Sequence, residues 1–384
     1  MEMSEITDVL SAIESLSERG EKMALATIVS VRGSTYRRPG ARLLVADDGD
    51  MVGNISGGCL EGDVADVARV VMVDGTPRLV SFDLTADDEV VWGWGLGCNG
   101  AIDVFVEPAE KAAEVAGALR RALEEERPLA VVTVLDSSVP NTESGARLLV
   151  HPHGRREGTT GDPVLDEWAA RSAADLLAAS RSEIVAFRSE AGEVRAFVEV
   201  LEPPMRLLVC GAGHDAIPVV QLTTALGWRV VVVDDRAEFL TSERFPEASG
   251  FVQVAGPEEA AREAGVDERT SVVVMSHNYV RDRDYLRGFL GTPVAYIGML
   301  GPRARTERIL AELRSSGTEP SAEDLAKIHG PAGLDVGSEG PDEIAAAIVG
   351  EILAVRRRRP AGFLRDRPGP IHQRPEPVAP GATS

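Results

Sequence analysis

In the second half of this 384-residue chain, the segment most indicative of the fold is Leu207-Leu208-Val209-Cys210-Gly211-Ala212-Gly213-His214-Asp215-Ala216. A short apolar run leads into the pattern GxGxxA, a helical pattern follows, and Asp234 ends the next apolar run. This combination is typical of a dinucleotide-binding fold, in which glycines let the backbone approach a pyrophosphate and the acid binds ribose hydroxyls. Gly211, Gly213, His214 and Asp234 are therefore candidate nucleotide-binding residues. A doubly wound domain that has lost its nucleotide is the alternative.

The chain beyond the glycine turn continues to alternate short apolar runs with helical patterns. This predicts an α/β domain of the Rossmann-like kind, a doubly wound parallel sheet, over residues 204–357. The last helix is expected near Pro341–Arg357, because proline and acids stand at its start and arginines at its end. Residues 358–384 have no apolar periodicity, so we expect a disordered tail. The expected strands are Arg206–Cys210, Arg229–Val233, Phe251–Ala255, Ser271–Met275 and Val294–Leu300.

The first 203 residues have a different pattern, in which glycine-rich turns separate short apolar runs. The hexapeptide Gly-Ala-Arg-Leu-Leu-Val occurs twice, at Gly40–Val45 and at Gly145–Val150, and a Phe-Val-Glu strand closes each half. We therefore predict an N-terminal α+β domain, residues 1–203, with an internal duplication of two degenerate repeats, residues 22–108 and 127–203. Chance similarity between common strand sequences is the alternative.

Two segments of the first repeat are candidate anion sites. The loop Arg32-Gly33-Ser34-Thr35-Tyr36-Arg37-Arg38-Pro39-Gly40 offers guanidinium groups and backbone N–H groups for a phosphate, with Arg37 and Arg38 as candidate ligands. The second segment runs through Ser56, Gly57, Gly58 and Cys59 into a helix, where free N–H groups favour anions and thiolates. A solvated turn and a small buried cysteine are the structural alternatives.

The segment Trp92-Gly93-Trp94-Gly95-Leu96-Gly97-Cys98-Asn99-Gly100 places a second cysteine among four glycines. Such a low side-chain volume suits a loop that covers a ligand better than it suits a packed core. Gly97 is therefore a candidate cofactor contact, and Cys98 and Cys59 are the candidate reactive thiols. Cys210, on an expected strand, is predicted to be a core residue. The wide spacing of Cys59 and Cys98 does not match a zinc site.

Two histidines and one further glycine lie on expected crevice loops of the second domain. His277 comes directly after one apolar run, Gly301 follows a later one, and His329 stands in a third glycine-rich loop. Ligands of open α/β sheets bind at the carboxyl ends of the strands, so these residues are candidates for the crevice beside the glycine turn. We take His277 as a candidate catalytic residue and the other two as cofactor contacts. A hydrogen-bonded structural histidine is the alternative.

The composition argues against several classes of protein. The 40 basic and 61 acidic side chains give a formal net charge of −21, which opposes binding to nucleic acid and to anionic membranes. We expect neither a membrane span nor a signal peptide, since no apolar run is long enough and the N-terminus is acidic. Three cysteines are too few for a disulfide framework and fit a reducing compartment, so we expect a cytoplasmic protein.

Together these motifs resemble the XdhC/CoxI family of accessory proteins for molybdenum hydroxylases, from about Met23 to Arg357. The segments that carry the resemblance are Gly33-Ser34, Arg38-Pro39-Gly40-Ala41, Ser56-Gly57-Gly58-Cys59, Gly97-Cys98-Asn99-Gly100, Cys210-Gly211-Ala212-Gly213-His214, His277 and Ile328-His329-Gly330-Pro331-Ala332-Gly333-Leu334-Asp335.

The resemblance implies a function. The family is associated with binding the molybdenum cofactor and delivering its sulfurated form to enzymes such as xanthine dehydrogenase. It implies a cofactor-insertion chaperone rather than a turnover enzyme, a molybdopterin cofactor with or without an attached nucleotide, and Cys98 as a molybdenum ligand. The expected partners are a molybdenum hydroxylase, a cysteine desulfurase and further copies of the chain in a homo-oligomer. The alternative is an NAD(P)-dependent oxidoreductase that uses the glycine turn and His277.

Overall fold

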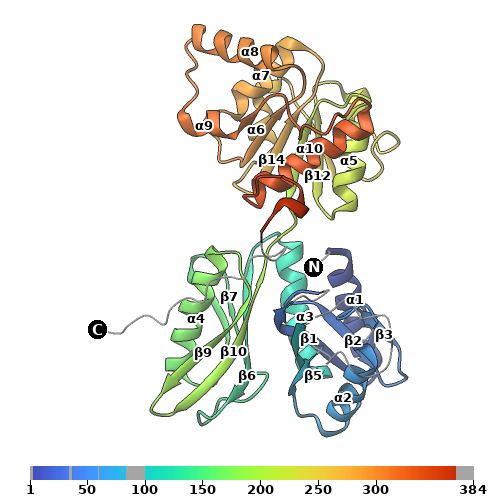
Figure 1. Ribbon diagram of the computed structural model, residues 1–384, viewed down its shortest axis with the longest axis vertical. Helices are drawn as coiled ribbons and strands as arrows, with labels where there is room; N and C mark the ends of the chain where they lie inside the picture. The colour runs from blue at the N-terminus through green and yellow to red at the C-terminus, as the bar shows by residue number, and fades with distance from the viewer. Residues whose placement is uncertain (1–2, 34–36, 59, 84–99, 369–384) are drawn as a thin grey trace. The chain divides into compact units, whose positions relative to one another are not determined.

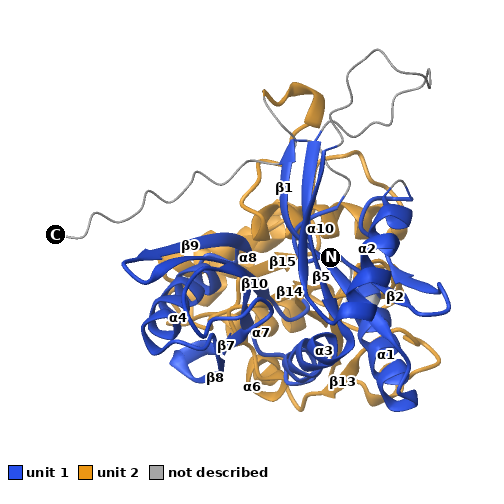
Figure 2. Cartoon of the chain, turned by 90° about the horizontal axis from the view of Figure 1, so that it is seen from below, with its two compact units in different colours: residues 1–204 blue, residues 205–384 orange. Residues whose placement is uncertain are grey.

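The computed structural model describes residues 3–33, 37–58, 60–83 and 100–368. The chain divides into two compact units, residues 1–204 and 205–384, and each unit is described by itself (Figures 1 and 2). In the expected tail, Leu364–Asp366 form the 3-10 helix η4, and residues 369–384 lie outside the described part. None of the described helices has the length and apolar character needed to cross a membrane.

Unit 1 contains two five-stranded antiparallel sheets. The first is built from β1 (Met23–Gly33), β2 (Arg42–Ala46), β3 (Met51–Gly53), β4 (Arg78–Asp83) and β5 (Gly100–Pro108). The second is built from β6 (Leu129–Ser137), β7 (Arg147–Val150), β8 (Arg156–Thr159), β9 (Glu183–Ser189) and β10 (Gly192–Leu201). The first sheet has the strand order β3-β2-β1-β5-β4 and the second has the order β8-β7-β6-β10-β9. If β6 to β10 are numbered as the first to fifth strands of their own sheet, the two orders are the same.

The two sheets also agree in register. The two copies of the hexapeptide run into β2 and β7, where Leu43 pairs with Gly53 and Leu148 pairs with Gly158. A bulge interrupts the pairing of β1 with β5 after Ile28, and an equivalent one interrupts the pairing of β6 with β10. The internal duplication that the sequence predicts is thus present in topology, register and irregularity.

In the described part of unit 1, four helices cover the sheets, namely α1 (Met3–Arg19), α2 (Glu61–Asp74), α3 (Ala109–Glu124) and α4 (Pro163–Ala178). α2 packs on one face of the first sheet and α4 on the matching face of the second. α1 and α3 pack against the other face of the first sheet together with strand residues of the second. Where no helix lies between them, the two sheets pack against each other through the buried side chains of Val29, Phe105, Leu135 and Phe197. A short 3-10 helix, η1 (Pro152–Gly154), links β7 to β8.

Unit 2 has a six-stranded parallel sheet. Its strands are β11 (Arg206–Cys210), β12 (Arg229–Asp234), β13 (Gly250–Gln253), β14 (Thr270–Val274), β15 (Tyr296–Met299) and β16 (Ile328–His329). They lie in the order β13-β12-β11-β14-β15-β16. If β11 is counted as the first strand, this is the Rossmann order 3-2-1-4-5-6. The chain progression reverses between β11, the first strand, and β14, the fourth.

Helices cover both faces of this sheet, as the alternation of apolar strands with helical patterns predicts. α5 (Ala216–Ala225) and α10 (Pro341–Arg356) pack on the face that carries Leu207 and Val209. α6 (Ala260–Ala264), α7 (Tyr279–Phe289) and α8 (Arg303–Ser315) pack on the face that carries Leu208 and Cys210. The remaining elements are α9 (Ala322–Lys327), η2 (Ala237–Phe239) and η3 (Pro257–Glu259). The Rossmann-like, doubly wound prediction is therefore confirmed.

Candidate functional site

The glycine turn after β11 lies where the strand order reverses, the usual ligand position in such sheets. Gly211 has φ 117°, and its N–H donates to the carbonyl oxygen of Val233 at 2.8 Å. A Cβ atom at this position would lie 2.7 Å from the Cα of Ser276, the second residue after β14. Glycine is therefore needed for the turn to pass the ends of its two neighbouring strands.

Three backbone N–H groups follow the turn. Those of Gly213, His214 and Asp215 have no acceptor among the residues that the structure describes. They precede α5, so they carry the partial positive charge of a helix start. Such N–H groups can bind an anionic group such as a phosphate. Gly213 and His214 therefore remain candidate nucleotide contacts.

Asp234, at the end of β12, is 1% exposed and its carboxylate accepts four hydrogen bonds. The Ala212 N–H donates to Oδ2 at 2.7 Å, and Arg236 donates its backbone N–H, Nε and Nη2, each at 2.9 Å. Burial opposes ionisation of this carboxyl, but the hydrogen bonds from Arg236 and Ala212 hold its pKa well below the usual range. Asp234 thus fixes the turn to the neighbouring strand, and its ribose-binding role stays a prediction.

His277 lies against the glycine turn. It is a non-glycine residue in the left-handed region, with φ 56°, and its Nε2 lies 3.1 Å from Oδ2 of Asp215. Its Cδ2 would lie 3.7 Å from a Cβ at Gly213, and about half of its side chain is exposed, 54%. The fold therefore brings His277 to the place where an anion would approach. Its catalytic role remains a prediction.

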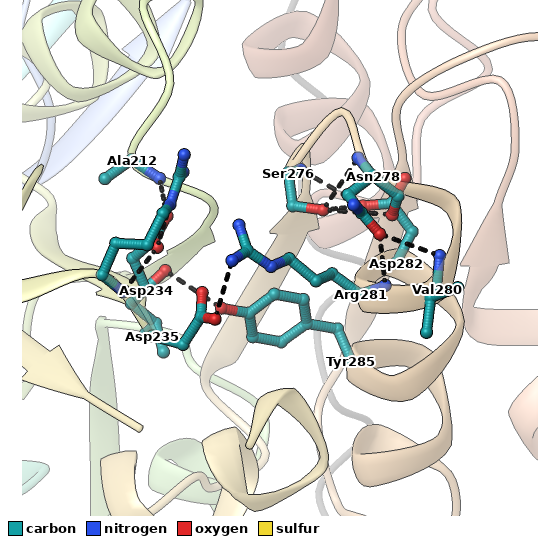
Figure 3. A network of polar contacts seen from close by, with 11 residues as sticks. Ala212, Asp234, Asp235, Ser276, Asn278, Val280, Arg281, Asp282 and Tyr285 are labelled. Carbon is teal, nitrogen blue, oxygen red and sulfur yellow. Dashed lines mark hydrogen bonds and ion pairs between the residues drawn. The ribbon is translucent and has the colours of Figure 1, made fainter. Parts of the chain in front are cut away.

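A buried acid holds the loop that carries His277 (Figure 3). Asp282, 1% exposed, accepts from the hydroxyl of Ser276 at 2.5 Å and forms an ion pair with Arg305. The side chain of Asn278 accepts from the N–H groups of the first turn of α7 and so caps that helix. These contacts fix the loop between β14 and α7. The cap by Asn278 is local, whereas the pair of Asp282 with Arg305 joins α7 to α8 and could not be predicted from neighbouring residues.

His329 lies on the edge strand β16, separated from β11 by β14 and β15. Its ring stacks on Tyr296 with centroids 4.6 Å apart, and its Nδ1 lies 3.2 Å from Oε1 of Glu351 on α10. Glu351 also accepts from the Tyr296 hydroxyl at 2.6 Å and the Gly333 N–H at 2.9 Å. Burial opposes its ionisation, yet these hydrogen bonds lower its pKa. His329 is thus part of a second polar cluster. Gly301, with φ 113°, follows β15 between the two clusters.

In unit 1, the segment before α2 is organised by one carboxylate. Glu61 accepts from the backbone N–H groups of Ile55, Ser56, Gly58 and Leu60 at 2.9–3.3 Å, and from the Ser56 hydroxyl. Two of the N–H groups predicted to bind an external anion, those of Ser56 and Gly58, are therefore bound by an acid of the chain itself. Burial opposes ionisation of Glu61, but the hydrogen bonds from Ser56 and the backbone lower its pKa. An acid at a helix start, five residues after a serine, is the sequence signal for this arrangement.

The arginine loop lies beside this segment. Arg37 donates to Glu5 of α1 at 2.8 Å and to Oδ1 of Asn54 at 3.5 Å. Asn54 in turn accepts from the Gly57 N–H at 2.9 Å. Arg38 is exposed and makes no ion pair with the described residues. The structure therefore unites Arg37 with the Ser56–Gly58 segment and leaves the guanidinium group of Arg38 available to a ligand.

The predicted thiol site falls mostly outside the described residues, which exclude Cys59, Gly97 and Cys98. Cys210 is fully buried on β11, and burial raises the pKa of its thiol well above the usual value. Among the described residues, no three or more His, Cys, Asp or Glu side chains form a group that could hold a metal ion.

Comparison with known proteins connects both units to one family. The profile of the XdhC Rossmann domain matches residues 207–352, and that of the XdhC and CoxI family matches residues 16–83 and 122–188, one segment in each repeat. The chain belongs to the XdhC and CoxI family. The matched XdhC Rossmann segment spans the glycine turn, Asp234, His277 and His329.

Similar XdhC-type proteins align over most of the chain. One from Bacillus subtilis, whose name describes a probable subunit of xanthine dehydrogenase, is 32% identical over 90% of this chain and 97% of its own length. Another, "Molybdenum cofactor insertion chaperone PaoD" from Escherichia coli, is 24% identical over 90% of this chain and 86% of its own. A crystal structure described as a xanthine dehydrogenase from Bacillus halodurans matches with TM-score 0.71 and 28% identity, over 94% of this chain and 98% of that one.

Proposed function

We propose that this protein binds the molybdenum cofactor and delivers it to a molybdenum hydroxylase of the xanthine dehydrogenase kind. The observation that carries the proposal is the alignment with an insertion chaperone over 90% of the chain, which includes both units. The Bacillus subtilis relative, named for xanthine dehydrogenase, points to the same class of client enzyme. We further propose that delivery involves the sulfurated cofactor, a cysteine desulfurase and a homo-oligomer of this chain in the cytoplasm.

The cofactor is cargo in this proposal, and two parts of the chain have suitable chemistry for it. Molybdopterin carries a phosphate and a dithiolene. Arg38 offers an exposed guanidinium to a phosphate, and Cys98 and Cys59 are the thiols that could contact molybdenum or receive sulfur. In unit 2, the N–H groups of Gly213 and His214, which have no acceptor in the described part of the chain, suit a phosphate of a cofactor nucleotide or of NAD(P).

The test is cofactor retention by the purified chain. Protein isolated from cells that make the cofactor is expected to release a fluorescent oxidised pterin and to activate a cofactor-free hydroxylase. Cys98→Ser is expected to fold and to lose most of its bound pterin and most of its ability to activate the hydroxylase. Folded Cys210→Ser is expected to keep both. A Cys98→Ser protein that activates the hydroxylase as well as the parent would refute the role of Cys98. Absence of pterin from the parent protein would refute the function.

An NAD(P)-dependent oxidoreductase is the second candidate. The contact of His277 with Asp215 beside three unpaired N–H groups favours it, because a histidine at this edge of the sheet could exchange a proton with a substrate. Oxidation of a reduced nicotinamide that depends on His277, in protein free of pterin, would support this candidate over the chaperone.

A further inference from the structure

The ribose side of the glycine turn has an unusual charge arrangement. In the Rossmann fold the acid after the second strand binds the ribose hydroxyls with its carboxylate oxygens. A carboxylate offers about four acceptor positions. In Asp234 all four are taken, one by the Ala212 N–H and three by Arg236. A ribose diol would therefore have to displace Arg236 before it could bind to Asp234.

Two guanidinium groups lie beside this saturated acid. Those of Arg236 and Arg244 lie 4.0 and 5.2 Å from the ring centre of the same phenylalanine, Phe239. Arg244 also donates from Nε to the carbonyl oxygen of Ala212 at 3.0 Å, so it is anchored to the glycine turn itself. A guanidinium held by a ring and a backbone carbonyl is pre-ordered for binding an anion.

The neighbouring acids do not neutralise Arg244. Asp234 is bound by Arg236, and Asp235 forms an ion pair with Arg281 at 2.8 Å. Glu238 is exposed and makes no ion pair with the described residues. Arg244 has no carboxylate partner in the described part of the chain. In a chain of net charge −21, the guanidinium of Arg244 thus lies beside the glycine turn without a directly paired carboxylate among the described residues.

We propose that the glycine-turn site of unit 2 selects a nucleotide that carries a phosphate ester on its ribose, held by Arg244 with Arg236. The inference rests on the proposed nucleotide binding and adds the ligand class. The ester oxygens would bind to the outer N–H groups of Arg244 and to Nη1 of Arg236, for which no bond to a described residue is found. Arg236 would keep its contacts with Asp234.

The experiment compares two probes that differ only in this phosphate, NAD⁺ and NADP⁺, by calorimetric titration of the full chain at fixed pH and salt. We expect NADP⁺ to bind at least about tenfold more tightly than NAD⁺, because charge-assisted hydrogen bonds to its extra phosphate contribute about this much affinity. The overall negative charge of the protein opposes this preference, so it can arise only from local contacts. Arg244→Gln is expected to weaken NADP⁺ binding by about tenfold and to leave NAD⁺ binding nearly unchanged.

Two further variants complete the design. Arg244→Lys retains the charge and is expected to recover part of the NADP⁺ preference. Arg314→Gln, an exposed pair-forming arginine near the end of α8, is expected to change neither affinity. Equal binding of the two probes, or equal losses for both in Arg244→Gln, would overturn the ribose-phosphate inference and leave nucleotide binding intact. Failure of both probes to bind would overturn the nucleotide binding as well as the ribose-phosphate inference.

Discussion

Arg42 of the first repeat forms a buried ion pair with Glu199 of the second. Arg147, at the matching position of the second repeat, pairs with Glu107 of the first. All four side chains are at most 8% exposed. Each hexapeptide thus supplies an arginine that crosses to the Phe-Val-Glu strand of the other repeat. The two pairs form one reciprocal arrangement, in which both repeats use the same two sequence elements, the hexapeptide and the Phe-Val-Glu strand.

The first prediction concerns these pairs. Glu199→Gln should leave the Arg42 charge buried without its counter-ion, and the cost is expected to be about 3–5 kcal/mol of unfolding free energy. Glu107→Gln should cost a similar amount because it is the equivalent change. Arg32→Gln is the control, since Arg32 pairs with Asp103 but is 61% exposed and should cost about 1 kcal/mol or less. Urea unfolding followed by circular dichroism measures the three values. Equal values for buried and exposed pairs would contradict the prediction.

The second prediction concerns the glycines of the repeated hairpins. A Cβ at Gly158 would lie 2.6 Å from the carbonyl oxygen of Arg147, at φ 83°. Gly154 has a similar φ, 84°, but nothing lies near its Cβ position. Gly154→Ala should therefore cost only the backbone strain, about 1 kcal/mol, and Gly158→Ala should cost about 1–3 kcal/mol more. Thermal unfolding of the two variants checks this. A smaller loss for Gly158→Ala would show that the strand adjusts.

The third prediction concerns acid stability. The pKa of Glu61 is lower in the folded protein than the ordinary value, because Ser56 and backbone N–H groups bind its carboxylate. Its contribution is therefore fully present above the ordinary glutamate pKa of about 4.3 and is lost as the pH falls through the lower folded value. Glu61→Gln should be less stable at neutral pH and should lose less stability on acidification. The exposed Glu124→Gln is the control. Parallel pH profiles for Glu61→Gln and the parent would contradict this assignment.

The fourth prediction concerns nucleotide binding. A Cβ at Gly213 would meet no closer neighbour than the His277 ring at 3.7 Å, so Gly213→Asp is expected to fold while placing a negative charge beside the three N–H groups. Nucleotide-induced thermal stabilisation should disappear. Gly250→Asp, where a Cβ meets nothing, is the matched control. Stabilisation that survives in folded Gly213→Asp would place the nucleotide elsewhere. Gly211→Ala is unsuitable because its Cβ would meet backbone atoms.

The fifth prediction concerns thiol reactivity. Burial raises the pKa of Cys210 and shields it, so a limiting amount of iodoacetamide should leave it unmodified until the protein is unfolded. We expect Cys98 to react first and Cys59 second, and added molybdenum cofactor to protect Cys98. Peptide mass spectrometry gives the order. Modification of Cys210 at the rate of the unfolded chain would show that β11 opens readily.

Local sequence patterns are enough to predict the architecture of both units. The glycine turn, the spacing to Asp234 and the alternation of strands with helices are short-range features, and they predict the Rossmann-like unit because each depends on the conformation of neighbouring residues. The repeated hexapeptide predicts the duplication for the same reason: equal sequences favour equal local structures.

The pairing of the polar groups, by contrast, depends on how the chain folds. The sequence offers Asp234 as a ribose ligand and the Ser56–Gly58 segment as an anion site. The fold binds Asp234 to Arg236, and it binds the N–H groups of Ser56 and Gly58 to Glu61. Likewise, Arg42 and Glu199 are 157 residues apart and meet only when the sheets pack. Hydrogen bonds and ion pairs act over a few ångströms, so which partner satisfies a given group depends on distances that exist only in the folded chain.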